Sequence, residues 1–298
     1  MLSEVLKLRL SALHRGHGEP SEGRASRGIP RDVGSQPHCS SDLAQCFPEG
    51  VVQETPRGEV FACEVPLKEI HSNASDVVEG YLGVFARAVG QLAVDGLPQH
   101  VQLLGKATPL TTALIDTETA GFHGRPLFLI GLARYDGDDL VLTQYFARDY
   151  TQEAALLGQF ADLLPRVDLL ISFNGKAFDW PFIRDRMVYH RLRTESSFAH
   201  LDLLHPSRRR WRAQLPNCRL QTLERHLCGR WRRGDVPSHE IPERYHRYVR
   251  EQDARFIAPV FHHNRLDLIA MVELLVALSS GGAGIDDEQR TTTPSERR

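Results

Sequence analysis

The sequence predicts an α/β fold in which a mixed sheet of five strands carries helices on both faces. Three observations lead to this fold class. Strand-like and helix-like segments alternate regularly after Gly105. The first three strands follow one another without a helix between them, and the turn sequence Asp136-Gly137-Asp138 joins the last two, so these three are expected to be antiparallel. Each of the two later strands follows a helix, which is typical of parallel strands.

Apolar residues, together with the residues that start or stop an element, place the strands and helices. Five strands are expected, at residues 112–118, 126–135, 139–146, 168–173 and 199–203. Three helices are expected among and after them, at residues 151–164, 178–191 and 260–278. Pro165 ends the first of these helices, and Pro259 immediately precedes the last.

Composition divides the chain into four parts. Residues 1–50 are rich in Gly, Ser, Pro and charge, and are expected to be a flexible segment with a short amphipathic helix near its start. Residues 51–104 are expected to form a small appended α/β unit. The predicted sheet and its helices make residues 105–280 the main domain, and the tail 281–298 is expected to be disordered.

The overall charge and the cysteines limit the classes of function. The 36 Lys and Arg against 38 Asp and Glu give a net charge of −2, so nucleic-acid binding would have to come from local patches. Five cysteines without a CxxC pair suit a reducing compartment, and Cys218 and Cys228 around His226 match no zinc pattern. Neither a membrane span nor a signal peptide is indicated, so a cytoplasmic protein without a membrane partner is expected.

The first strand ends in two carboxylates. Asp116 and Glu118 are two residues apart in Leu-Ile-Asp-Thr-Glu-Thr, and they therefore lie on one face of the strand. Two adjacent anions at the end of a buried strand repel each other, and a divalent cation would supply the missing charge. The alternative is a solvated strand end that opens into the turn at Gly121.

Two later segments carry further polar residues at positions where sites form. Asp179 opens the helix that follows a buried strand, a place where α/β sheets bind ligands, although capping the helix would also explain it. In the last helix, His263 and Asp267 are four residues apart and share a face that is expected to turn inward. They form either a satisfied structural contact or part of a site.

The order of these motifs resembles the DEDD exonuclease superfamily of ribonuclease-H-like fold, and more closely its YprB-like branch. The resemblance extends over residues 113–277, through the segments DTET, SFNGKAFDWPFI, HLDLLHPSRR, EIPERYHRYV and HNRLDLIAMVELL. It implies a five-stranded ribonuclease-H-like sheet and a 3′–5′ exonuclease. It also implies two Mg²⁺ or Mn²⁺ ions held by four carboxylates, with a histidine that deprotonates or orients the attacking water. The implied residues are Asp116, Glu118, Asp179, Asp267 and His263.

The choice of histidine depends on the helix. His262 lies five residues before Asp267, the spacing of the histidine-type members of the superfamily, and His263 lies four before, as in the YprB-like branch. A continuous helix places His263 about 40° from Asp267 and His262 about 140° away, so it favours His263. A break in the helix would reverse this. Asp202 is a further candidate site residue, with capping of the next turn as its alternative.

Arginines surround two tryptophans near the middle of the predicted domain. Arg208, Arg209, Arg210 and Arg212 flank Trp211, and Arg230, Arg232 and Arg233 flank Trp231. Cations beside an aromatic platform suit single-stranded nucleic acid, whereas a solvated loop with an anchoring tryptophan is the alternative. The candidate nucleic-acid-binding residues are Thr117, Asn174, Lys176, Arg208, Arg209 and Trp211.

Three functions remain in competition at this point. The first is a metal-dependent nuclease that acts on DNA or RNA, with no obligate protein partner indicated. The second is a nucleic-acid-binding module of the same fold with little or no catalysis, which would gain nothing from a cluster of buried anions. The third is a structural protein whose carboxylates form caps and ion pairs, and it predicts no stabilisation by manganese.

Overall fold

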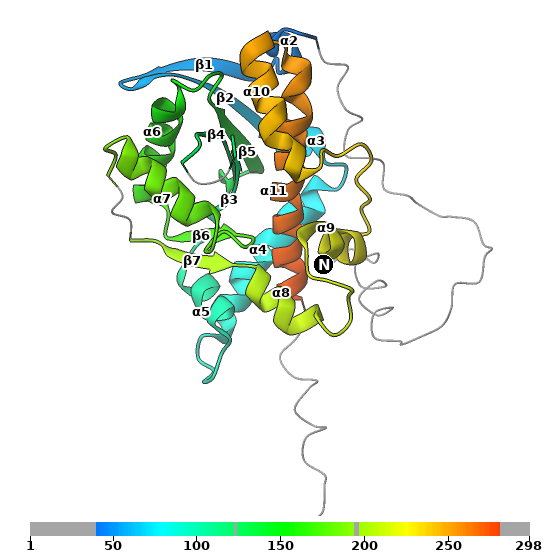
Figure 1. Cartoon of the computed structure of the whole chain (residues 1–298). Helices are drawn as coiled ribbons and strands as arrows, with labels where there is room; N and C mark the ends of the chain where they lie inside the picture. The colour runs from blue at the N-terminus through cyan, green and yellow to red at the C-terminus, as the bar shows by residue number, and fades with distance from the viewer. Residues whose placement is uncertain (1–39, 122–123, 194–196, 281–298) are drawn as a thin grey trace, which may run out of the picture.

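A single mixed sheet organises the protein in the computed structural model, which describes residues 40–121, 124–193 and 197–280 (Figure 1). Its seven strands have the order β1-β2-β5-β4-β3-β6-β7. The strands are β1 (Gly50–Thr55), β2 (Gly58–Pro66), β3 (Thr112–Thr119), β4 (Leu127–Tyr135), β5 (Leu140–Phe146), β6 (Leu169–Ser172) and β7 (Ala199–Asp202).

The pairing confirms the predicted mixed sheet. β3, β4 and β5 pair antiparallel, and β6 and β7 extend the sheet in parallel from β3. The expected number of five strands was wrong, because the hairpin β1–β2 adds two more by pairing β2 antiparallel with β5. That pairing satisfies the backbone groups along an edge of β5 that would otherwise stay exposed. The separate unit expected over residues 51–104 stays a prediction, and its strands are hydrogen-bonded into the common sheet.

The three helices expected at residues 151–164, 178–191 and 260–278 are found within a few residues of those bounds, as α6, α7 and α11, and the structure adds others. The longer helices are α4 (Ala74–Gln91), α5 (Gln99–Lys106), α6 (Glu153–Leu163), α7 (Asp179–Tyr189), α8 (Leu204–Trp211), α10 (Ile241–Glu251) and α11 (Ala258–Ser279). Short ones are α2 (Leu43–Cys46), α3 (Leu67–Ile70) and α9 (Leu220–Leu223), the last continued by a π-helical turn η3 (Glu224–Cys228). The helix expected near the start of the chain and the tail 281–298 lie outside the described residues.

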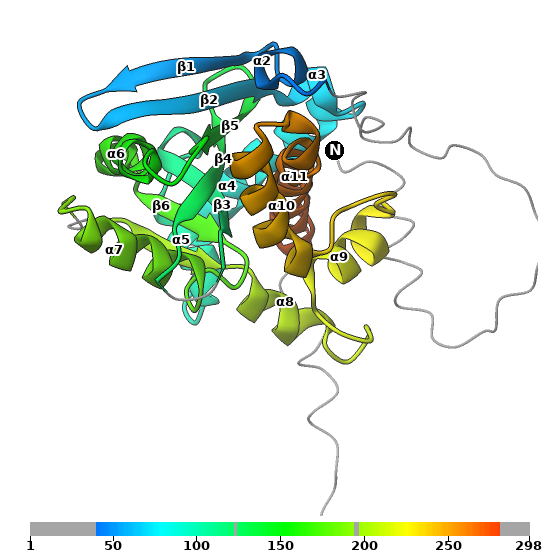
Figure 2. The same ribbon diagram turned by 45° about the horizontal axis from the view of Figure 1, so that its top comes forward.

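The alternation of side chains along β3 separates two hydrophobic cores. Ala113 and Ile115 belong to a core that includes residues of α6 and α7 and that also extends to α10 on the other side of the sheet. Leu114 belongs to a second core built with α4 and the carboxyl half of α11. Figure 2 shows α6 and α7 lying apart from α10 and α11, with the sheet between the two pairs. This arrangement confirms helices on both faces of the sheet.

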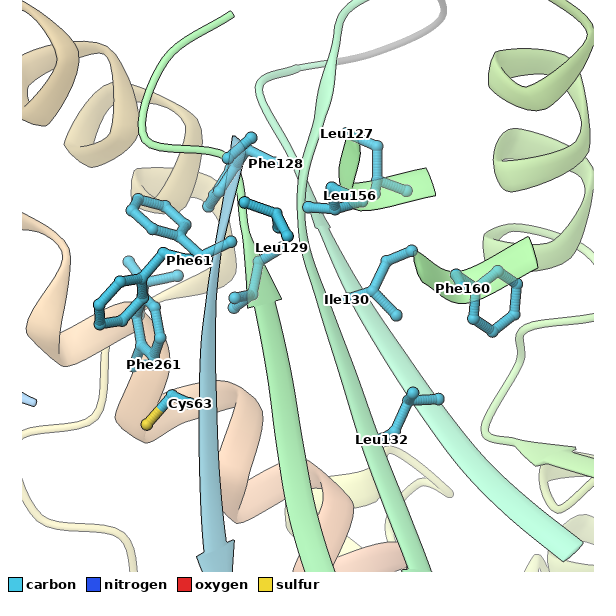
Figure 3. Close-up of a cluster of buried hydrophobic side chains, with 14 of the residues drawn as sticks. Phe61, Cys63, Leu127, Phe128, Leu129, Ile130, Leu132, Leu156, Phe160 and Phe261 are labelled. Atoms are coloured by element: carbon cyan, nitrogen blue, oxygen red, sulfur yellow. The ribbon is translucent and has the colours of Figure 1, made fainter. Parts of the chain in front are cut away.

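Helix α11 is the buried axis of the fold. Its side chains contribute to both cores, Phe261 to the first and Leu268 to the second. In Figure 3 Phe261 lies beside Phe61 of β2, and their ring centroids are 6.4 Å apart in an edge-to-face arrangement. A helix buried on nearly all sides requires a partner for every polar residue it carries, which makes those residues informative about function.

The state of the cysteines and the hydropathy of the helices complete the description of the fold. Cys63 and Cys218 are free thiols, whereas Cys46 is disulfide-bonded, which the sparse set of cysteines did not predict. None of the helices in residues 40–121, 124–193 and 197–280 combines the length and the apolar character that a bilayer crossing requires.

A buried ion-pair network fixes α7 to α6. The Glu153 side chain accepts hydrogen bonds from the Leu127 amide at 2.8 Å, from Arg186 Nε at 2.6 Å and from His190 at 2.8 Å. Glu153→Gln should lower the free energy of unfolding by about 3 kcal/mol, because it leaves the Arg186 charge without its partner. Urea unfolding measures the change.

The control for this substitution is Glu251→Gln, which removes a half-exposed partner of Arg250. Surface pairs of this kind contribute at most about 1 kcal/mol. Equal losses of stability in the two variants would contradict the view that the Glu153 network secures α7.

Candidate functional site

Asp116 and Glu118 lie on the part of β3 that extends beyond its pairing with β6. β6 pairs with β3 only over Thr112–Leu114, so the following residues stand at the carboxyl edge of the parallel strands. The two-residue period puts both carboxylates on the side of Leu114, which faces the core shared with α11. A register shift after Glu118 then ends the regular strand. The structure thus places this pair where open α/β sheets bind ligands.

Asn264 of α11 holds Asp116 in place. Its amide nitrogen donates to Asp116 Oδ2 at 2.8 Å and to the Asp116 carbonyl at 3.2 Å. Its amide oxygen accepts from Gln144 Nε2 at 2.9 Å, and Gln144 Oε1 accepts from Arg265 Nε at 2.7 Å. A Cβ on Gly131 would lie 2.0 Å from that amide oxygen, so glycine is required for this contact.

Asp179 is presented by a loop that Asp202 fastens. Asp202 is buried and accepts from the backbone amides of Asn174 at 2.8 Å, Lys176 at 3.2 Å and Leu204 at 3.0 Å. Asn174 has a φ of 65°, in the left-handed region that asparagine tolerates. Asp202 therefore holds the shape of the loop, which agrees with the capping role that was the alternative to a site residue. Asp179 itself accepts a short hydrogen bond from the Thr117 hydroxyl.

His263 and Asp267 share one face of α11, as the four-residue spacing predicted. The helix is unbroken from Ala258 to Ser279, and His263 Nε2 lies 3.5 Å from Asp267 Oδ2. The condition that favours His263 over His262 is therefore met. His263 Nδ1 lies 2.7 Å from Asp235 Oδ1, and Asp267 Oδ1 lies 2.6 Å from Arg232 Nη2.

Electrostatic repulsion connects the acidic side chains of β3 with those of α7 and α11. Burial raises the pKa of Asp116 well above its ordinary value, and the charges of Asp267 and Asp179 raise it further. Burial also raises the pKa of Glu118, followed by the charges of Asp116, Asp267 and Asp179. Burial raises the pKa of Asp179 to about 6. Groups contributed by α7 and α11 therefore act on the ionisation of the two carboxylates of β3.

The donor set suits a hard divalent cation, although the side chains do not enclose one. Carboxylate oxygens are the ligands that Mg²⁺ and Mn²⁺ prefer, and mutual repulsion gives them a reason to bind a cation. Asp267 Oδ1 is buried, and it contacts Arg232 without hydrogen-bond geometry. Across the described ranges, no three His, Cys, Asp or Glu side chains converge closely enough to hold one ion. Metal binding would thus require side-chain rotation.

The predicted nucleic-acid contacts divide into accessible and inaccessible residues. Trp211 is only 2% exposed and packs in the second core, so its prediction as a stacking platform was wrong. The ring lies at the end of α8 and faces the core, while Arg208 and Arg209 stay exposed. Lys176 is exposed on the Asp179 loop, whereas the Thr117 hydroxyl is occupied by Asp179.

The second arginine cluster has a structural role that the sequence did not indicate. Arg230 and Arg232 both pair with the buried Glu224, at 2.9 Å and 2.6 Å, so they are not available to a phosphate backbone. Trp231 stays 60% exposed, with the Arg225 guanidinium 3.4 Å from its ring centroid. Sequence reasoning missed Asp235, Arg232 and Asn264 as members of the site, and the only available signal was Asn264 beside His263.

The pKa of Asp179 predicts how stability depends on pH in the metal-free protein. The folded carboxyl has a pKa of about 6, and in the unfolded chain its value returns to about 4. Because the folded pKa is the higher one, the protonated carboxyl stabilises the folded state. This contribution is complete below about pH 4 and is lost as the pH rises through about 6. Asp179→Asn should flatten this decline, measured as the melting temperature across that range with a chelator present.

Asp139→Asn is the matched control, because Asp139 is buried and accepts from the backbone amides of Lys68 in α3 and Leu140 in β5. It should keep the native dependence on pH. Identical slopes for native protein and Asp179→Asn would contradict the predicted role of this carboxyl.

The Gly131–Asn264 contact provides a second prediction. Gly131→Ala should destabilise the protein by about 1–3 kcal/mol, because the new methyl group forces Asn264 away from Asp116 and Gln144. Gly90→Ala is the control, since a Cβ there meets nothing within 4 Å on helix α4. Urea unfolding of the two variants decides the matter. A Gly131→Ala protein as stable as the control would show that Asn264 does not need this space.

Comparison with known proteins supports the assignment of the fold. A family model described as the RNase_H superfamily matches residues 113–279. The uncharacterized protein YprB of Bacillus subtilis (strain 168) is 34% identical over 171 residues, which cover 55% of this chain and 41% of that protein. The chain thus spans less than half the length of this relative.

Two solved structures show weaker similarity. One is the family B DNA polymerase of the archaeon Pyrobaculum calidifontis, 16% identical, with a TM-score of 0.45 over 56% of this chain and 24% of that chain. The other is the zinc-bound E. coli ExoI–ssDNA complex, 18% identical, with a TM-score of 0.34 over 53% of this chain and 44% of that chain. Because the family model spans more than half of the sequence, the chain belongs to the RNase_H superfamily and has YprB as a relative.

Proposed function

We propose that the protein is a metal-dependent nuclease of the two-metal-ion type, which hydrolyses phosphodiester bonds in single-stranded DNA or RNA. Membership in the RNase_H superfamily supports a nuclease-type function. The 3′–5′ exonuclease direction follows only from the resemblance to DEDD exonucleases. The relative YprB is an uncharacterized protein, so the finer parts of this proposal depend on the site itself.

One observation carries the proposal: acidic side chains from three separate elements lie at a single edge of the sheet, where Thr117 donates to Asp179 and Asn264 donates to Asp116. The charges of Asp267 and Asp179 both raise the pKa of Asp116, although these groups come from α11, α7 and β3. Carboxylates that served only to cap helices or turns would have no reason to lie close together, because the neighbouring charges make ionisation of Asp116 unfavourable. Divalent cations would turn the repulsion into attraction.

In this proposal Asp116, Glu118, Asp179 and Asp267 hold two Mg²⁺ or Mn²⁺ ions. Such ions supply an activated water and stabilise charge on the leaving oxygen. The protein's own contribution is positional. Asn264 fixes Asp116, and Thr117 fixes Asp179, so two of the carboxylates are oriented before any ligand binds.

His263 is the proposed proton acceptor. Its ring lies at the inner side of α11, and Nε2 lies 3.5 Å from Asp267 Oδ2. A general base of this kind typically contributes about 10²- to 10⁴-fold to the rate. The exposed Arg208, Arg209 and Lys176 would contact the phosphate backbone, and Asn174 belongs to the same loop as Lys176.

The test is cleavage of end-labelled single-stranded DNA and RNA in the presence of Mn²⁺ or Mg²⁺. Asp116→Asn should lower the rate by more than the 10- to 100-fold typical of losing a contact that supports a ligand, about 100-fold or more. Asp139→Asn is the control and should cleave like the native chain, because Asp139 accepts from the backbone amides of Lys68 and Leu140 and is no part of the proposed site. The labelled fragments also reveal the sugar preference and the direction.

A binding measurement separates this function from a binding module. If the native chain binds single strands without metal-dependent cleavage, and Asp116→Asn binds equally well, the nuclease proposal is wrong. Manganese should also raise the melting temperature of the native chain more than that of Asp116→Asn, because metal that binds only the folded state stabilises it.

A further inference from the structure

The segment between η3 (Glu224–Cys228) and α10 lies against the face of α11 that carries His263 and Asp267. Three of its side chains reach that helix. Arg232 contacts Asp267 and Asp235 contacts His263, while Arg230 pairs with Glu273 one turn and a half farther along. These contacts join a loop to the proposed catalytic helix, and no motif in the sequence marks them.

The contact between Asp235 and His263 defines how the imidazole is used. Nδ1 of His263 lies 2.7 Å from Asp235 Oδ1, whereas Nε2 lies 3.5 Å from Asp267 Oδ2. An ionised carboxylate can only accept, so Nδ1 must carry the hydrogen in this bond. In a neutral ring, Nε2 is then the nitrogen without hydrogen, and it is the one on the side of the proposed metal ligands.

Asp235 is itself held on both of its oxygens. Oδ1 also accepts from the Val236 amide at 2.9 Å. Oδ2 accepts from Arg232 Nη1 at 3.1 Å and from Gln221 Nε2 at 3.3 Å. The Arg232 side chain is only 6% exposed and is fixed in turn by Glu224 at 2.6 Å. A carboxylate with this many fixed partners has little freedom to rotate, so it can set the orientation of the ring it binds.

We propose that Asp235 is a positioning residue for His263: its carboxylate keeps the hydrogen of the neutral ring on Nδ1 and leaves Nε2 to accept a proton from the attacking water. This inference rests on the proposed nuclease function. Arg232 takes part by orienting Asp235 while it neutralises Asp267 in the protein without substrate. Partners of this kind fix both the tautomer and the orientation of a histidine.

A purely structural role is the competing explanation. In that case Asp235 would only balance the charge of Arg232 and secure the loop, and the tautomer of His263 would not depend on it. Melting temperature alone cannot separate the two roles, since loss of Asp235 weakens the loop in both. The tautomer of His263 and the catalytic constant can separate them.

The first measurement is the tautomer of His263 by long-range ¹H–¹⁵N NMR of the metal-free protein at a pH where the ring is neutral. His263→Gln assigns the signals by their loss. The native ring should carry its hydrogen on Nδ1, and Asp235→Ala should move it to Nε2, the form that free imidazole side chains favour. An unchanged tautomer in Asp235→Ala would overturn the proposal.

The second measurement is single-strand cleavage with metal present. Asp235→Ala should lower kcat by about 10- to 100-fold, the usual effect of removing a residue that orients a functional group, and leave KM within about twofold. Asp235→Asn should recover part of kcat, because its amide oxygen still accepts from Nδ1. Asp139→Asn is again the control, as a buried aspartate bound by backbone amides away from the site.

The outcomes separate the positioning role from the function on which it rests. A changed tautomer with an unchanged kcat would reduce Asp235 to a structural residue and overturn the role. If the native protein cleaves nothing, the nuclease proposal fails and the positioning role fails with it, while the NMR result still shows whether Asp235 holds the ring. Loss of Nδ1 hydrogen together with the fall in kcat supports the inference.

Discussion

Electrostatic repulsion among half-buried carboxylates is the constraint on which the arrangement of this protein depends. The charges of Asp267 and Asp179 act on Asp116 across three elements of the fold. Three of these carboxylates have a partner that holds them: Asn264 donates to Asp116, Thr117 donates to Asp179, and the Arg232 guanidinium lies against Asp267. Each of these partners lies on a different segment. The positions of the carboxylates therefore depend on how the sheet, the loop and α11 pack against one another.

The same constraint explains the features that first look like ordinary stabilisation. Gly131 has no side chain because Asn264 occupies that space, and Asp202 ties down the loop from which Asp179 projects. Buried polar groups of this kind contribute little net stability and are costly when a partner is lost. Their value to the molecule lies in fixed geometry, which a two-ion site or a general base requires.

The sequence predicted what depends on local periodicity. Period two placed Asp116 and Glu118 on one face, and the helical period chose His263 over His262, because both rules act within one element. The addition of β1 and β2 to the main sheet was missed, since pairing with β5 is a long-range choice between sheet edges. Trp211 was misjudged because its neighbours are charged while the ring itself faces the core. Asp235 reaches His263 from a separate loop, which no spacing rule describes.

Arg265 links the site to the amino-terminal hairpin. Its guanidinium binds Gln144 at 2.7 Å, and through Gln144 it supports Asn264 and Asp116. The same guanidinium contacts Glu49 Oε1 at 2.8 Å and Cys63 Sγ at 2.9 Å. A fragment beginning at residue 105 would contain every proposed ligand but would leave this cation without those two partners. The minimal unit that preserves the geometry of Asp116 therefore begins before Glu49, although all of its chemistry lies beyond residue 115.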